Sequence, residues 1–446
     1  MKQYRINELI LYRGFEQDQD ELLTDLANLV NELDAEDEDS VFYEEQEQKD
    51  VYFSCIHRLV DLAGTYGFAG NLWHCYLTYL LVNHENVFSK ACEIHGPVEG
   101  SINAIAAHDF EIYRELFRFD FQELEKRLGV QGFSMISDYV NVNENSKMFN
   151  KRIRDRICSL SVRLAEAKDI AEFMDDMIQF YKDFGVGKLG LHKAFRVAQD
   201  EDGVHIVPIP NIAHVHLDDL VGYEIAKKKL IDNTEAFVKG RKANNCLLFG
   251  DAGTGKSSSI KGILNQYYDQ GLRIIEIYKH QFQALNDVIA QIKNRNYRFI
   301  IYMDDLSFED FETEYKYLKA VIEGGLEKRP ENILIYATSN RRHLVREKFS
   351  DKEDRRDDLH SSDTVQEKLS LVYRFGVKIF FCAPNKKEFQ NIVRTLAERY
   401  GLEMPEEELL LKANQWELQH GGLSGRTAQQ FIDYLLGQVP EEEPGH

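Results

Sequence analysis

Proline is scarce in this sequence, and the spacing of its cysteines matches no pattern of a disulfide-linked fold. Of 446 residues, 8 are proline and 6 are cysteine, and no cysteine pair has the CxxC spacing of a zinc or redox motif. Scattered cysteines are typical of a reduced protein whose thiols pack in the core. We therefore expect neither a disulfide framework nor a structural metal, and we expect the protein in the cytoplasm.

The sequence also lacks an excess of basic charge and long apolar runs. Its 54 Lys and Arg residues stand against 75 Asp and Glu residues, a net charge of −21. This balance disfavours a general nucleic-acid-binding role, because binding phosphate requires Lys and Arg. The longest apolar stretch, 77–82, is far shorter than the roughly 20 residues that span a bilayer. The first twenty residues lack the apolar segment of a signal peptide. We expect no membrane interaction.

What is present is the composition of a globular protein, with 43% hydrophobic and 29% charged residues. In the first part of the chain, apolar residues recur at helical spacing. Three such stripes run through 22–33, 110–124 and 170–181. They predict an all-helical domain whose aromatic side chains form a core, while the acidic cluster 34–39 predicts a solvated loop.

The pattern changes after Gly190. Two short apolar segments, 195–197 and 204–207, flank Asp202-Gly203 and predict a β-hairpin. From about residue 218, apolar strands alternate with amphipathic helices, which is typical of a parallel α/β sheet. The predicted parts are a helical domain (1–190), a hairpin and linker (191–217), an α/β core (218–383), a helical lid (384–438) and a tail (439–446). We expect the charged stretch 341–363 to be an exposed insertion.

A glycine-rich segment follows the apolar run 246–249. Residues 250–257 read Gly-Asp-Ala-Gly-Thr-Gly-Lys-Ser and fit GxxxxGK[ST] between a strand and a helix. Glycines let the backbone curl so that its N–H groups point at phosphate oxygens, at the positive end of a helix. The pattern therefore predicts a nucleoside triphosphate site. The predicted binding residues in this segment are Gly250, Gly253, Thr254, Gly255, Lys256, Ser257 and Ser258.

A second apolar strand, 299–303, ends in two acidic residues. Asp304 is predicted to hold Mg²⁺ together with the Ser257 hydroxyl. Asp305 stands where a general base would take a proton from the attacking water. Three polar residues further along the chain are weaker candidates by themselves. Asn340 follows an apolar strand, Arg374 precedes the apolar run 377–381, and Arg426 opens a C-terminal helix.

In this order the motifs resemble those of the AAA+ ATPases over residues 218–436. By that resemblance Val221 and Gly222 contact adenine, 250–257 is the Walker A loop and 299–305 is the Walker B strand. The resemblance also implies that Asn340 is the sensor 1 residue, Arg374 an arginine finger reaching a neighbouring subunit, and Arg426 the sensor 2 residue on the lid. It thus implies ATP, Mg²⁺ and a homo-oligomer. Segments 303–308 and 337–344 are closest to a bacterial AAA+ family of unknown function with a helical N-terminal half.

Two departures from the AAA+ pattern bear on activity. AAA+ hydrolases usually carry Glu where this sequence has Asp305, and the shorter side chain predicts slow hydrolysis. After the apolar segment 274–277, residues 278–283 lack the glycine of the pore loop found in protein-threading members, which disfavours processive translocation of a polypeptide.

Three functions remain open from the sequence. The first is a Mg²⁺-dependent ATPase that remodels a protein partner held by the helical domain. The second is a nucleotide-dependent switch with little hydrolysis. The third is a nucleic-acid-linked loader or initiator, which local basic groups such as 227–229 permit and the acidic total disfavours.

Overall fold

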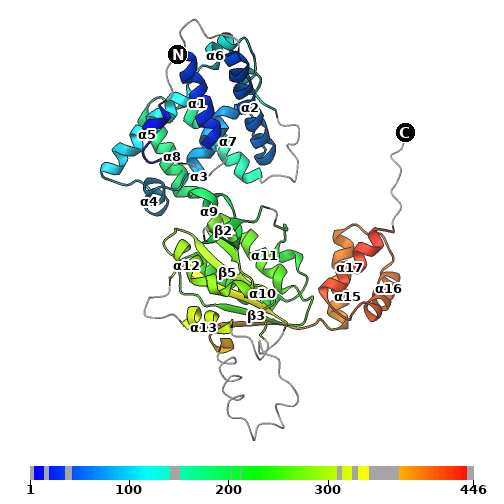
Figure 1. Cartoon of the computed structure of the whole chain (residues 1–446). Helices are drawn as coiled ribbons and strands as arrows, with labels where there is room; N and C mark the ends of the chain where they lie inside the picture. The colour runs from blue at the N-terminus through cyan, green and yellow to red at the C-terminus, as the bar shows by residue number, and fades with distance from the viewer. Residues whose placement is uncertain are drawn as a thin grey trace, which may run out of the picture. The chain divides into compact units, whose positions relative to one another are not determined.

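The computed structural model describes residues 5–14, 20–35, 43–140, 151–201, 203–210, 212–308, 314–323, 330–340 and 371–438 (Figure 1). The chain divides into two compact units, Met1–His192 and Lys193–His446. Most of the predicted acidic loop 34–39, the charged stretch 341–363 and the tail 439–446 lie outside the described residues. Among the described residues, no helix combines the length and apolar character needed to cross a bilayer.

The first unit is helical around an aromatic core. Tyr12, Tyr76, Phe110 and Phe173 are among its fully buried side chains. Its helices are α1 (Asp20–Ala35), α2 (Tyr43–Tyr66), α3 (Leu72–Asn83), α4 (Val87–His95), α5 (Ser101–Phe117), α6 (Phe121–Leu128), α7 (Lys151–Glu166), α8 (Ile170–Phe184) and α9 (Gly187–Leu191).

The predicted apolar stripe 110–124 is divided between two helices. Helix α5 ends at Phe117, and the Asp120 side chain accepts a hydrogen bond from the backbone N–H of Gln122, which caps the start of α6. A short polar side chain in this position satisfies a backbone donor that the new helix leaves without a partner. The residues of the stripe are nevertheless mostly buried, as predicted for a core.

In its described residues, the second unit is built on a seven-stranded sheet of order β2-β1-β4-β5-β6-β3-β7. Only the β1–β2 pair is antiparallel, and all other neighbours are parallel. The strands are β1 (Ala194–Asp200), β2 (Gly203–Pro208), β3 (Cys246–Gly250), β4 (Leu272–Glu276), β5 (Arg298–Met303), β6 (Ile333–Ser339) and β7 (Val377–Phe381).

Helices lie on both faces of this sheet, and Figure 1 shows α11 and α12 on opposite sides of it. Leu230, Ile260 and Ile263 from α10 and α11 pack against one face, beside the buried Leu248 and Tyr336 of the strands. The helices of this unit are α10 (Glu224–Val238), α11 (Lys256–Tyr267), α12 (Leu285–Ile292), α13 (Tyr315–Glu323), α15 (Lys386–Arg399), α16 (Glu406–Gln419) and α17 (Gly425–Leu436). The last three form the lid around their own apolar core. The predicted fold class is therefore confirmed.

The predicted hairpin belongs to the sheet. Asp200 pairs with Gly203 across the predicted turn, and Ala194, Phe195 and Arg196 of β1 pair with Ile274–Glu276 of β4. Strand β1 pairs with a strand about eighty residues later in the sequence, and no local sequence pattern predicts such a pairing. The hairpin thus forms the outer part of the sheet.

The register of the central strands brings the predicted site together. Strands β5, β6 and β3 are consecutive neighbours, with Met303 opposite Ala337 and Phe249 opposite Ser339. Because these strands are parallel, the segments that follow β3, β5 and β6 emerge at one edge of the sheet, where ligands of open α/β sheets bind.

Candidate nucleotide-binding site

The glycine-rich segment forms a tight loop between β3 and α11. Gly250, Gly253 and Gly255 have φ values of 136°, 73° and 90°, in the region that favours glycine. A Cβ atom on Gly250 would lie 2.0 Å from the carbonyl oxygen of Phe381 on the neighbouring β7. The Thr254 hydroxyl donates to the carbonyl oxygen of Asp251 at 2.8 Å, within the loop. The glycines are therefore required by the backbone path itself.

Lys256 is the first residue of α11 and is buried within the loop. Its Nζ atom donates to the carbonyl oxygens of Gly250 at 3.1 Å and Asp251 at 2.6 Å. Burial lowers the pKa of Lys256, while the negative charges of Asp251, Asp305 and Asp304 oppose that shift. An ammonium group that is partly desolvated and held by carbonyl dipoles is well placed to exchange them for a phosphate oxygen.

Asp304 follows β5 and accepts hydrogen bonds from hydroxyl groups on three elements. Its Oδ1 atom accepts from Ser257 Oγ at 2.8 Å, Tyr302 Oη at 2.6 Å and Thr338 Oγ1 at 2.5 Å. Burial alone would raise the pKa of Asp304, but these hydrogen bonds outweigh burial and hold it below its usual value. The side chain is thus a carboxylate joined directly to the Ser257 hydroxyl, and these two oxygen groups are ligands that Mg²⁺ accepts.

Asp305 has a left-handed backbone conformation, with φ of 48°. Its N–H donates to Thr338 Oγ1 at 2.9 Å, and its Oδ1 atom accepts from Asn340 Nδ2 at 2.7 Å. The conformation is uncommon for residues other than glycine, although Asp and Asn tolerate it best. It directs this acidic residue to Asn340 while Asp304 faces Ser257.

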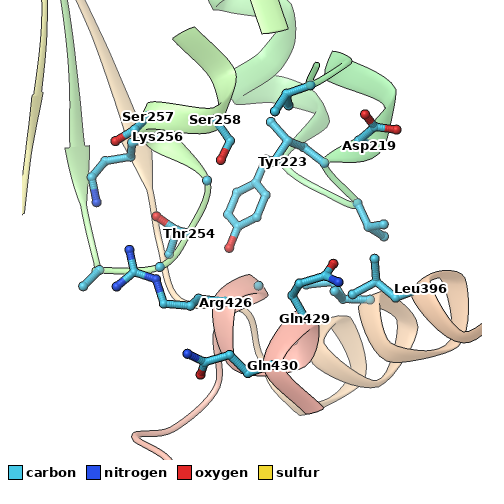
Figure 2. Close-up of a pocket in the computed structure, with 18 of the residues that line it drawn as sticks. Asp219, Tyr223, Thr254, Lys256, Ser257, Ser258, Leu396, Arg426, Gln429 and Gln430 are labelled. Carbon is cyan, nitrogen blue, oxygen red and sulfur yellow. The ribbon is translucent and has the colours of Figure 1, made fainter. Parts of the chain in front are cut away.

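These groups line a pocket of about 820 Å³ between the sheet and the lid (Figure 2). The volume is in the range of sites for small molecules and cofactors. Of the residues predicted from sequence, the lining contains Val221, Gly253, Thr254, Gly255, Lys256, Ser257, Ser258, Asp304, Asp305, Asn340 and Arg426. Gly222, between two lining residues, has φ of 84° and shapes the turn, and Gly250 lies where β3 enters the loop.

The lid approaches the loop closely. The backbone N–H of Arg426 donates to the carbonyl oxygen of Gly253 at 3.2 Å, and Ser424 caps the start of α17 by accepting from the Thr427 N–H at 3.0 Å. A Cβ atom on Gly253 would lie 3.0 Å from Ser424 Oγ and 3.1 Å from Arg426 Cβ. The second loop glycine is therefore needed for the lid contact as well as for the turn.

Arg374 is not brought to this pocket. It precedes β7, whose first residue, Val377, pairs with Cys246 at the start of β3. The loop follows the other end of β3, so Arg374 lies toward the opposite edge of the sheet within one chain.

Several residues around the pocket were not predicted from the sequence. Thr338 had a usable signal, because it is a polar residue at the end of an apolar run, as Asp304 is. The strand register places it one position after the Met303–Ala337 pair, opposite Asp304. Tyr302 had no such signal, because an aromatic residue within an apolar strand is read as core. Tyr223, whose pKa burial raises to about 12, and lid residues carried no such signal. The lid residues of the lining are Ile392, Leu396, Arg399, Tyr400, Gly425, Gln429 and Gln430.

A family model described as a protein of unknown function, DUF815, matches residues 190–439, which is more than half of the chain. None of the curated proteins matches this chain. Among solved structures, a mutant of RuvB from Thermotoga maritima is 17% identical with a TM-score of 0.36, over 51% of this chain and 66% of that chain. The chain thus aligns with just under two thirds of that protein.

The AAA domain of FIGL-1 in complex with ADP is 16% identical with a TM-score of 0.35, over 51% of this chain and 74% of that chain. The matched segment 190–439 contains the whole sheet, the loop and the lid described above. The predicted resemblance to a family of unknown function is confirmed.

Proposed function

We infer that this chain, which belongs to the DUF815 family of proteins of unknown function, binds ATP with Mg²⁺ in the pocket between its sheet and its lid and hydrolyses it slowly. The observation that carries this proposal is the hydrogen bond of 2.8 Å between Ser257 Oγ, on the helix that follows the glycine loop, and Asp304 Oδ1, at the end of β5. This pairing joins a hydroxyl at a helix N-terminus to a carboxylate beside a buried lysine.

The residues present fit a triphosphate with its metal. Backbone N–H groups of the loop and the start of α11 would hold the phosphate oxygens, and Lys256 would exchange its two carbonyl partners for them. Ser257 and Asp304 would hold Mg²⁺, which supplies positive charge to the phosphate groups. By the resemblance, Val221 and the adjacent Gly222 would contact the base, and Arg426 would sense the phosphates from the lid; Val221 and Arg426 both line the pocket.

In the proposed reaction, Asp305 takes a proton from a water held with the help of Asn340. The water oxygen bonds to the γ-phosphorus, the bond from that phosphorus to the bridging oxygen breaks, and ADP leaves with the electron pair. Asp305 is one methylene shorter than glutamate and its carboxylate also accepts from Asn340 at 2.7 Å. Both features support slow turnover, because a general base must reach its proton within hydrogen-bonding distance.

We further propose that the active form is a homo-oligomer and that the helical unit Met1–His192 holds a protein partner, which the nucleotide cycle remodels. The position of Arg374 at the opposite edge of the sheet supports a role toward a neighbouring subunit, where an arginine would stabilise charge in the transition state. Residues 1–200 carry 21 Lys and Arg against 36 Asp and Glu, which favours a protein partner over nucleic acid.

A nucleotide-dependent switch is the second candidate. The observation that favours it is the same Asp305–Asn340 hydrogen bond, since a base occupied by an amide donor would leave the chain in its ATP-bound state for a long time. In that case the lid position, coupled to the loop through the Arg426–Gly253 contact, would be the signal.

Phosphate release from ATP by the purified full chain separates these functions. We expect Mg²⁺-dependent release that Lys256→Ala abolishes and that Lys261→Ala, an exposed lysine on the same helix, leaves unchanged. Release equal in the wild type and Lys256→Ala, together with ATP binding by the wild type, would support the switch. Absence of both release and binding would refute the proposed function.

A further inference from the structure

Two cysteines in the helical unit lie in direct contact. Cys75 is in the first turn of α3 and Cys158 is in the middle of α7, and these helices pack together in the core. The Cys75 thiol donates to Cys158 Sγ, with 3.9 Å between the sulfur atoms. Cys75 is fully buried and Cys158 is partly exposed, so an external reagent reaches Cys158 first.

The surroundings of Cys158 stabilise a thiolate. Its sulfur accepts from the Cys75 thiol and from the backbone of Ala69, and the positive charge of Arg154 lies one turn earlier on α7. The hydrogen bond from Cys75 is the main cause that lowers the pKa of Cys158 below its usual value, against the opposing effects of burial and of the Asp155 charge. The same hydrogen bond raises the pKa of Cys75. Burial instead raises the pKa of Cys55 to about 12 and that of Cys92 to about 11. Only a thiolate is a strong nucleophile, so Cys158 differs in kind from those two residues.

We propose that Cys158 and Cys75 are a peroxide-reactive dithiol, which oxidation converts to a disulfide linking α3 to α7. This site is separate from the proposed nucleotide pocket and does not depend on it. The arrangement is a partly exposed nucleophilic sulfur with a buried second sulfur in contact, which is the requirement for a reactive and a resolving cysteine.

The reaction balances with hydrogen peroxide as the oxidant. The Cys158 thiolate attacks one peroxide oxygen, the O–O bond breaks, and the departing hydroxide takes up the proton that Cys158 had released, forming water. The sulfur of Cys75 then attacks the sulfur of the Cys158 sulfenic acid. The S–O bond breaks, and hydroxide leaves with the Cys75 proton as a second water. Two thiols are oxidised and one peroxide is reduced to two waters.

The disulfide would close a loop between positions 83 residues apart. Such a link restricts the unfolded chain, so oxidation is expected to raise the thermal unfolding midpoint of the helical unit. The proposed consequence is a helical unit whose α3–α7 contact becomes covalent under oxidising conditions.

Mass spectrometry of the full wild-type chain tests this directly. After a small excess of hydrogen peroxide, we expect the intact mass to fall by two hydrogen atoms and a non-reducing peptide map to link Cys75 with Cys158. Dithiothreitol should restore the original mass. The proposal is overturned when Cys75 and Cys158 both remain thiols under conditions that oxidise the exposed Cys382.

Variants identify which sulfur reacts first. With dimedone present during oxidation, Cys75→Ser should accumulate an adduct on Cys158, because the resolving sulfur is gone. Labelling of Cys158 should exceed that of the buried Cys92 at least about tenfold. Cys92→Ser is the matched control and should form the disulfide as the wild type does. Equal labelling of Cys92 and Cys158 would contradict the assignment.

Discussion

Thr338 contacts both acidic residues of the site, although its side chain carries no charge. Its hydroxyl donates to Asp304 Oδ1 at 2.5 Å and accepts from the Asp305 N–H at 2.9 Å. One hydroxyl therefore orients a carboxylate and fixes the left-handed backbone of the next residue. Partners of this kind tune the groups that bind a metal, even though they do not touch it themselves.

Replacing Thr338 should raise the Mg²⁺ concentration that turnover requires. Thr338→Val keeps the shape and removes the hydroxyl, so the Mg²⁺ concentration for half-maximal phosphate release is expected to rise about tenfold or more. Thr338→Ser keeps the hydroxyl and should behave like the wild type. A valine variant with an unchanged Mg²⁺ midpoint would rule out this positioning role.

Asp305→Asn should separate binding from turnover. Asparagine tolerates the left-handed conformation, so the variant should fold, but its amide cannot accept a proton from water. We expect ATP affinity close to that of the wild type and a kcat lower by roughly 10²–10⁴, the usual contribution of a general base. Binding is measured by calorimetry and turnover by phosphate release. A kcat equal to that of the wild type would show that Asp305 is not the base.

At the scale of single residues, the sequence predicts the charged residues and glycines of the site, but not the uncharged residues that contact them. Lys256, Ser257 and Asp304 stand in patterns whose residue types are dictated by phosphate and metal chemistry. Tyr302 supplies a hydroxyl to Asp304 from within an apolar strand, where an aromatic residue reads as core. Leu396 of the lid reaches the pocket only through tertiary packing, which no local pattern encodes.

At the scale of elements, the strands were predictable and their partners were not. The apolar segments 246–249, 299–303 and 333–338 are strands because short buried runs bounded by polar residues suit a parallel sheet. The hairpin of β1 and β2 was correctly predicted as a hairpin, but its pairing with β4 depends on residues distant in the sequence. A short stretch of sequence can thus predict a strand, but it cannot predict which strands will be its neighbours in the sheet.

The hairpin's place in the sheet has a stability consequence. Phe195 of β1 is fully buried, whereas its neighbour Arg196 is exposed. Phe195→Ala should destabilise the second unit by about 3–5 kcal/mol, the usual cost of removing a buried aromatic side chain, and lower its urea midpoint. Arg196→Ala should change the midpoint little. Similar midpoints for the two variants would mean that the hairpin behaves as a linker.

At the scale of the whole molecule, the proposed nucleotide site lacks the arginine that precedes β7, because Arg374 does not line the pocket. Arg374 lies toward the other edge of the sheet, so a single chain would lack its contribution. A site completed by a neighbour makes activity depend on assembly, because the arginine stabilises transition-state charge only when the subunits meet.

Specific activity should therefore rise with protein concentration. Arg374→Ala is expected to lower kcat roughly 10³-fold, the scale found for arginine fingers, and to remove the concentration dependence, while ATP binding remains. Lys378→Ala, which removes an exposed cation from β7 itself, is the control and should retain the dependence of activity on protein concentration. Light scattering with ATP reports the assembly. Wild-type activity that is independent of concentration, in a chain that stays monomeric with ATP, would oppose the oligomeric proposal.

The most direct measurement of the central claim is a calorimetric titration of ATP into the full chain, with and without Mg²⁺. We predict saturable uptake near one nucleotide per chain, strengthened by Mg²⁺ and lost in Lys256→Ala, whose fold is checked by circular dichroism. A folded wild-type chain that takes up no ATP in the presence of Mg²⁺ would contradict the account.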